Sequence, residues 1–162
     1  MDETKDSCLL VDEYKKEMEF FHQLLVIQDR KKLFKAVIDY LTEKIPNTEC
    51  SIFLVDRESD KLYLEDSSNQ ELLKQGNNCK YVKNQGKTGW VFANKKSIFI
   101  EDRKKERDYL YKYPGLNSDK ENLNFHETLP VGPFLAVPII NEFSDKKDLI
   151  GVIRIPSKIE NN

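Results

Sequence analysis

Cysteine, histidine and glycine are the residue types in this sequence whose chemistry and spacing could form a catalytic, metal-binding or phosphate-binding site. The three cysteines, Cys8, Cys50 and Cys79, are an odd number and have no CxxC spacing. They predict reduced thiols, and neither a disulfide framework nor a zinc site. The two histidines, His22 and His126, are not spaced as a metal-ligand pair. With no G-x-S-x-G nucleophile elbow either, the sequence predicts no catalytic centre of these kinds.

The stretch GKTGWVFANKKSIFIED, residues 86–102, has two glycines three residues apart. It differs from a phosphate-binding loop, because its Lys-Thr pair precedes the second glycine and does not follow it. We expect the glycines to allow a tight turn that places Trp90 and Phe92 in the core. The strand after the turn would then bring Asp102 to the mouth of a pocket, so only this last residue is a functional candidate.

Length and composition indicate one soluble globular domain. The chain has 162 residues, of which 39% are hydrophobic and 33% charged, and its net charge is −2. That length can bury a core without metal or disulfide support. The mixed charge gives no basic surface for nucleic acid, and no apolar run reaches the roughly 20 residues of a membrane span. Since residues 1–6 are acidic and polar, we expect no secretory signal and a cytoplasmic location.

Two helices are predicted at the start of the chain. Residues 12–28 have helical spacing of apolar side chains, and Asp29 can cap a second helix that Pro46 ends. In the first helix, one apolar stripe steps by four, four, three and four residues, close to the spacing of a coiled coil. A second stripe lies beside it, so one could serve the core and the other a partner subunit, or both could pack on the same sheet. The first stripe is Leu10, Tyr14, Met18, Phe21 and Leu25.

The rest of the sequence predicts strands joined mainly by hairpins. Expected strands are residues 50–55, 61–65, 79–82, 97–101, 134–140 and 149–155, with short helical segments near 71–74 and 89–94. Residues 103–132 are irregular and long enough to be a lid or a binding loop. The predicted class is therefore α+β, with a central antiparallel sheet of five to six strands and helices on both faces.

Four segments in this order resemble the GAF domain, a small-molecule sensing module of signalling proteins. They are GKTGWVF at residues 86–92, SIFIED at 97–102, FLAVPI at 134–139 and LIGVIRI at 149–155. The resemblance implies a GAF/PAS-like, profilin-like fold over residues 29–156. Residues 1–28 would then be a helical extension able to dimerise, and residues 157–162 a tail.

GAF domains typically bind a ligand between the sheet and the irregular segment that crosses it. In this sequence that segment carries aromatic rings and two arginines suited to an anionic group. The alternative is that its tyrosines are ordinary packing residues. The candidate ligand-binding residues are Asp102, Arg103, Arg107, Tyr109, Tyr111, Phe125 and His126.

The sequence lacks most of the residues that GAF domains with particular ligands or activities carry. Asn124 to Glu127 lacks most of the cyclic-nucleotide signature, so this ligand is unsupported. No cysteine stands between Arg103 and Leu129, which argues against covalent bilin. Free methionine sulfoxide reductases need two thiols, and Thr88 stands where that family has one of them.

The sequence therefore predicts a non-catalytic sensory or regulatory module that binds an unidentified small ligand. It would relay a signal through a homodimer formed by the N-terminal helix, with an effector domain outside this chain. Two alternatives stay open: a thiol enzyme like free methionine sulfoxide reductase, in which Cys79 would act, and a ligand-free GAF scaffold for dimerisation.

Overall fold

The computed structural model describes residues 3–76, 79–101, 112–116 and 133–157, with side chains described from residue 12 onward. The chain divides into two compact units, residues 1–37 and 38–162. No helix in the described part of the chain is both long enough and apolar enough to cross a membrane.

The first unit holds helix α1, Glu3–Val26, and the start of helix α2, Arg30–Lys44. Asp29 caps α2 as predicted, because its Oδ1 accepts a hydrogen bond from the Lys32 backbone nitrogen at 2.9 Å. Helix α1 begins nine residues before the predicted residue 12. The acidic, polar start of the chain gave no apolar periodicity from which that extension could be predicted.

The two apolar stripes of α1 differ in exposure. Phe20 and Leu24 are half-buried, and so is Ile27, which follows the end of the helix at Val26. The other stripe is open, with exposed fractions of 62% for Tyr14, 55% for Met18, 54% for Phe21 and 82% for Leu25. Its fifth predicted member, Leu10, lies outside the residues whose side chains the structure describes.

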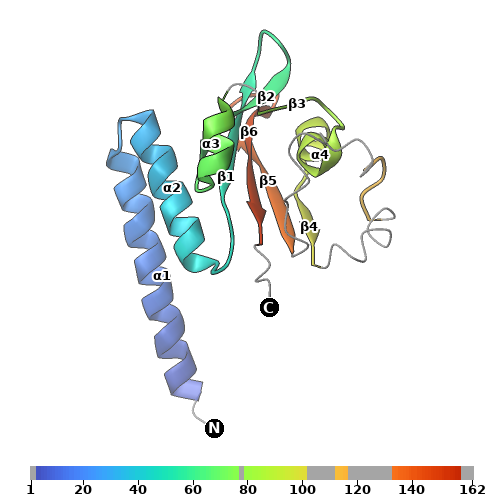
Figure 1. The fold of residues 1–162 in the computed structure, drawn as a ribbon. Helices are drawn as coiled ribbons and strands as arrows, with labels where there is room; N and C mark the ends of the chain where they lie inside the picture. Colours follow the sequence, from blue (N-terminus) through green and yellow to red (C-terminus); the bar gives the residue numbers. More distant parts are fainter. Residues whose placement is uncertain (1–2, 77–78, 102–111, 117–132, 158–162) are drawn as a thin grey trace. The chain divides into compact units, whose positions relative to one another are not determined.

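The second unit is built on one six-stranded antiparallel sheet, in the order β3-β2-β1-β6-β5-β4 (Figure 1). The predicted α+β class with an antiparallel sheet of five to six strands is confirmed. The strands are β1 Ser51–Asp56, β2 Lys61–Ser67, β3 Lys80–Tyr81, β4 Ile98–Ile100, β5 Phe134–Asn141 and β6 Asp148–Pro156.

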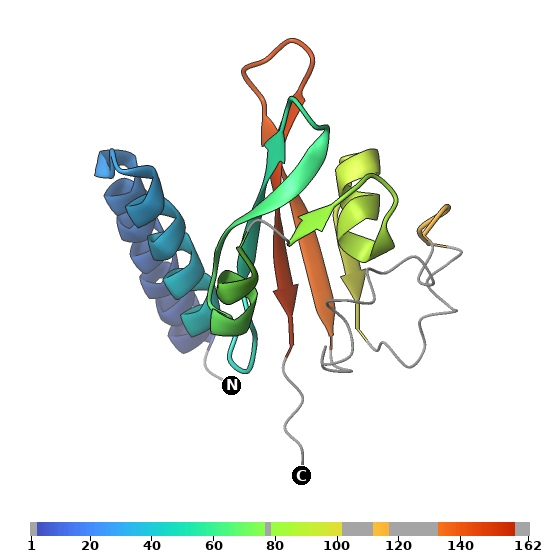
Figure 2. The ribbon, with the colours of Figure 1, turned by 45° about the horizontal axis from the view of Figure 1, so that its top comes forward.

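Two hairpins form the middle of the sheet, β1 with β2 and β5 with β6. Their loops lie at the same end of the sheet (Figure 2). The turn between β1 and β2 is stabilised by Asp56, whose carboxylate accepts hydrogen bonds from the Glu58 backbone nitrogen and the Ser59 hydroxyl. Strands β1 and β6 then pair with each other, which joins the two hairpins into one sheet.

Two short helices follow the first hairpin. Helix α3, Gln70–Gln75, is capped by Asn69 and buries Leu72. Helix α4, Gly86–Asn94, contacts β5 and β6 and lies beside them in Figures 1 and 2. It begins three residues before the predicted helical turn, directly after its N-cap residue Gln85. At Gly89 an added Cβ would overlap the Val82 carbonyl oxygen, so this first turn requires glycine.

The core lies on the face of the sheet against which α4 packs. Trp90 and Phe92 are buried there as predicted, together with Phe53, Val152 and Ala136 from three neighbouring strands. The glycine of β6 allows those strands to approach, because a Cβ on Gly151 would overlap the carbonyl oxygen of Phe53 on β1. The sheet and α4 therefore enclose the hydrophobic core of this unit between them.

Candidate functional site

The structure does not test the seven predicted ligand-binding residues. All of them fall in residues 102–111 and 117–132, outside the described part of the chain. They are Asp102, Arg103, Arg107, Tyr109, Tyr111, Phe125 and His126. Ligand binding by this segment stays a prediction.

One tyrosine of the irregular segment is described, and it packs in the core. Tyr113 is buried, and its ring meets the Trp90 ring edge-on with centroids 5.3 Å apart. Its hydroxyl donates to the Phe99 carbonyl oxygen at 3.0 Å and accepts from the Phe99 backbone nitrogen at 2.9 Å. The Trp90 indole nitrogen also donates to the Pro114 carbonyl oxygen at 2.9 Å. These contacts fasten residues 112–116 to α4 and β4, so Tyr113 has a packing role.

A row of polar side chains crosses the core face of the sheet. Ser67 on β2 pairs with Ser51 on β1, and Ser51 pairs with Arg154 on β6, so the three side chains share one face. The two serine hydroxyls are 2.8 Å apart. The Ser67 hydroxyl also donates to the Cys50 carbonyl oxygen at 3.2 Å. The serines therefore satisfy each other and the backbone, and the arginine is the exceptional member of the row.

Arg154 is a buried cation with only 1% of its surface exposed. Its Nη1 donates to the Tyr81 hydroxyl at 2.8 Å, and its guanidinium carbon lies 5.5 Å from the centroid of the Phe53 ring. Within the described residues, Nε and Nη2 are buried without a hydrogen-bond partner, and no carboxylate pairs with the guanidinium. Buried N–H groups of this kind are rare, because each loses its hydration without replacement.

Arg154 and Tyr81 are not among the candidate site residues predicted from the sequence. The available signal was a single charged residue between Ile153 and Ile155 in an otherwise apolar strand. Because successive side chains of a strand point to opposite faces of the sheet, Arg154 lies on the face opposite to Ile153 and Ile155. Which face carries the arginine depends on the pairing of β6 with β1, which the sequence does not specify.

Cys50 and Cys79 are free and fully buried. Burial raises the pKa of Cys50 from 9.0 to about 12, although the charge of Arg154 acts in the opposite direction. Burial likewise raises the pKa of Cys79 to about 11, again partly offset by Arg154. Both side chains are therefore neutral thiols at neutral pH, which is the unreactive form for nucleophilic or redox chemistry.

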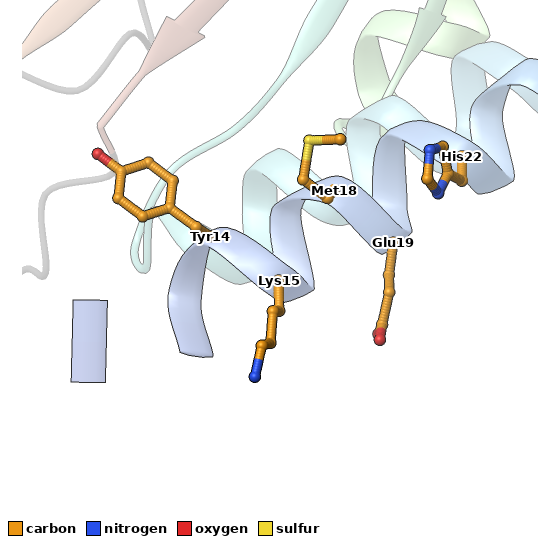
Figure 3. A pocket seen from close by; sticks show the side chains of 5 residues that line it. All are labelled: Tyr14, Lys15, Met18, Glu19 and His22. Carbon is orange, nitrogen blue, oxygen red and sulfur yellow. The ribbon is translucent and has the colours of Figure 1, made fainter. Parts of the chain in front are cut away.

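A separate surface pocket of about 400 Å³ lies on α1. It is lined by Tyr14, Lys15, Met18, Glu19 and His22, and Figure 3 shows all five on this one helix. His22 is thus on the first helix as predicted. Since the walls all come from the same helix, the pocket is a stretch of open helix surface and does not enclose a ligand. It coincides with the exposed apolar stripe.

Within the described residues, no group of three or more histidine, cysteine, aspartate or glutamate side chains is placed to hold a metal ion. The chemistry that the described part of the chain displays is therefore that of one buried, incompletely paired guanidinium and of two neutral thiols.

Comparisons with known proteins agree with this fold. The GAF domain of a phosphoenolpyruvate-protein phosphotransferase (ptsP) from Coxiella burnetii superposes with a TM-score of 0.64 and 20% identity, over 90% of this chain and 76% of that one. The corresponding domain from Acinetobacter gives a TM-score of 0.63 and 16% identity over the same shares. Free methionine-R-sulfoxide reductase from Neisseria meningitidis gives 0.60 and 16%, over 88% and 72%.

At these identities the solved structures establish the fold alone. The curated proteins contain no significant match to the chain. The GAF domain family itself matches residues 29–158, which is most of the chain and includes every strand of the sheet. The chain therefore belongs to the GAF domain family.

Proposed function

We propose that this GAF domain is a non-catalytic sensory or regulatory module, which binds a small ligand and relays its state through a homodimer formed by α1. The observation that carries the relay is the exposed stripe Tyr14, Met18, Phe21 and Leu25. Its members are separated by four, three and four residues, the spacing with which two helices pack side by side in a coiled coil. Large apolar side chains gathered on one open helix face are typical of a protein interface.

The domain organisation follows from this proposal. Residues 1–28 form the relay extension, residues 29–156 the sensing domain, and residues 157–162 the tail. The GAF domains of Coxiella and Acinetobacter phosphoenolpyruvate-protein phosphotransferases have the same fold. Since those two GAF domains come from phosphotransferases, we propose by analogy that this domain acts on an effector domain outside this chain. The free thiols Cys50 and Cys79 fit a reducing, cytoplasmic location.

Native mass spectrometry of the purified protein tests both parts of the proposal. We expect a dimer that retains a small molecule and releases it on denaturation. A dimer that never carries a ligand, even after incubation with cell extract, would support the alternative of a ligand-free dimerisation scaffold. A monomer would contradict the relay.

The thiol enzyme is the second candidate function, because free methionine-R-sulfoxide reductase shares the fold. Buried neutral thiols disfavour it, since the attacking species in such chemistry is an accessible thiolate. The test is reduction of free methionine sulfoxide with a thiol reductant, by the wild type and by Cys79→Ser. Turnover that Cys79→Ser abolishes would establish the enzyme and overturn the proposed non-catalytic role.

A further inference from the structure

Only one of the three guanidinium nitrogens of Arg154 has a hydrogen-bond partner within the described residues. Nη1 is occupied by the Tyr81 hydroxyl, whereas Nε and Nη2 have no partner within the described residues. The N–H groups of Nε and Nη2 point in the same direction from the planar guanidinium, so the two unused donors form one edge of the fork. That edge matches two oxygens of a carboxylate or phosphate, which accept two parallel hydrogen bonds from it.

The surroundings hold the fork in place. The Tyr81 hydroxyl fixes one side of the guanidinium, and the Phe53 ring lies 5.5 Å from its central carbon. Those two rings also pack edge-on against each other, with centroids 5.2 Å apart. Because the donors are already oriented, a ligand would lose less free energy in ordering them than it would with an exposed arginine.

The energetics of burial favour an anionic occupant. A buried cation without an anion loses its hydration, and the nearby ring face replaces only part of it. In such a water-poor environment, a charge-assisted hydrogen bond is stronger than at the surface. Arg154 stands in a core strand between Ile153 and Ile155, a position where burial of an unpaired charge is costly.

We propose that Arg154 anchors the ligand of this domain, and that this ligand is a small organic anion whose carboxylate or phosphate group receives two hydrogen bonds from Nε and Nη2. The inference rests on the proposed sensing function and adds to it the anchoring residue and the chemical class of ligand. The site is on the core face of the sheet, and it does not depend on the seven residues predicted from the sequence.

Thermal unfolding in different anions tests the proposal. The melting temperature is measured in sodium succinate, in sodium phosphate and in sodium chloride of equal ionic strength. For the wild type, we expect succinate or phosphate to raise it by roughly 3 °C over chloride, at an anion concentration about ten times the dissociation constant. A response to succinate alone assigns a carboxylate ligand, and a response to phosphate alone assigns a phosphate.

Three variants identify the residue responsible. Arg154→Met should abolish the anion-specific rise, and Arg154→Lys should greatly reduce it, because an ammonium group keeps the charge but lacks the two-pronged edge. Arg57→Met removes an exposed arginine from the β1–β2 turn and should leave the rise unchanged. This matched control accounts for general stabilisation of the folded state by phosphate. Should Arg154→Met fail to fold, Arg154→Lys still decides the question.

Two results would overturn the inference. One is an equal anion-specific rise in the wild type and in a folded Arg154 variant, and the other is no rise in the wild type with either anion. Native mass spectrometry separates this failure from that of the proposed function. A molecule retained equally by the wild type and Arg154→Met would leave sensing intact and remove Arg154 from it. Absence of both a retained molecule and an anion response would remove ligand binding as well.

Discussion

The Nη1 atom of Arg154 lies 2.8 Å from the hydroxyl oxygen of Tyr81 and joins β6 to β3, although 73 residues separate the two in sequence. Strand β3 is only two residues long and stands at the edge of the sheet. Tyr81 therefore links the short edge strand to the central strand through a buried hydrogen bond, in addition to the backbone pairing of β3 with β2.

Replacing Tyr81 by phenylalanine should destabilise the fold more than loss of an exposed hydroxyl. The change leaves Nη1 of the buried guanidinium without its acceptor, so we expect the free energy of unfolding to fall by about 1–3 kcal/mol. Urea unfolding of the wild type and of Tyr81→Phe measures this change in the free energy of unfolding. Tyr14→Phe, which removes the hydroxyl of an exposed tyrosine on α1, is the control and should change stability by less than about 0.5 kcal/mol. Equal losses would show that the Arg154 contact contributes nothing.

Replacing Gly151 by alanine should disturb the pairing of β6 with β1. The added Cβ would overlap the Phe53 carbonyl oxygen, which belongs to backbone and cannot turn aside as a flexible side chain could. We expect a loss of about 2–3 kcal/mol in the free energy of unfolding, the upper part of the range of about 1–3 kcal/mol found for overpacked cores.

The matched control for this change is Gly76→Ala. Its Cβ would meet no atom within 4 Å, but its backbone φ is +50°. With ψ at −127°, that backbone lies outside the left-handed helical region, in a sparsely populated conformation that favours glycine, so the change should cost about 1–3 kcal/mol from conformation alone. Gly76→Ala thus measures a conformational cost without a clash, whereas a Gly151→Ala protein as stable as the wild type would show that the close approach of the two strands is not the reason for a glycine in β6.

Much of the fold could be predicted because its signals are local. Alternating apolar residues marked β2, continuous apolar runs marked β1 and β5, and Asp29 and Pro46 marked the ends of α2. The motif glycines were also correctly assigned to scaffold. Gly86 and Gly89 open α4 and thereby place Trp90 and Phe92 in the core.

The candidate site at Arg154 was less predictable because it depends on contacts between distant strands. The resemblance to GAF domains and the length of the irregular segment, residues 103–132, favoured that segment as the ligand site. Burial of Arg154 instead arises from the pairing of β6 with β1, and its contact with Tyr81 requires the full order of the sheet from β6 to β3. Neither relationship leaves a local pattern in the sequence. The seven loop residues stay candidates for which the described structure provides no test.

The buried thiols should make stability fall in alkaline solution. Below pH 9.0, the ordinary thiol pKa, Cys50 and Cys79 are protonated in both the folded and the unfolded chain. Between pH 9.0 and about 11 for Cys79, or about 12 for Cys50, the unfolded chain releases these protons while the folded chain retains them. The free energy of unfolding should then fall by up to about 1.4 kcal/mol per pH unit for each thiol.

Urea unfolding of the wild type, Cys50→Ala and Cys79→Ala between pH 8 and pH 11 measures this dependence. Each alanine variant should lose stability less steeply than the wild type above roughly pH 9, whatever constant offset its smaller side chain introduces. Parallel curves for all three proteins would mean that other groups, such as tyrosines and lysines, cause the alkaline loss.

Charges introduced into the exposed stripe of α1 should separate the proposed dimer. Met18→Glu and Leu25→Glu, made together, place two carboxylates at positions that would face the partner helix, where burial of a charge is costly. Light scattering after size exclusion should show a dimer for the wild type and a monomer for this variant at the same concentration.

The control for the stripe is Gln23→Glu, which adds one negative charge at an exposed position of α1 outside the stripe. It should remain dimeric. Because Met18 and Leu25 are already exposed within one chain, their replacement should leave the helix content and the melting temperature of the sheet unit nearly unchanged, so loss of the dimer cannot be ascribed to unfolding. A doubly substituted protein that stays dimeric would place the interface elsewhere and remove the exposed stripe from the signal relay.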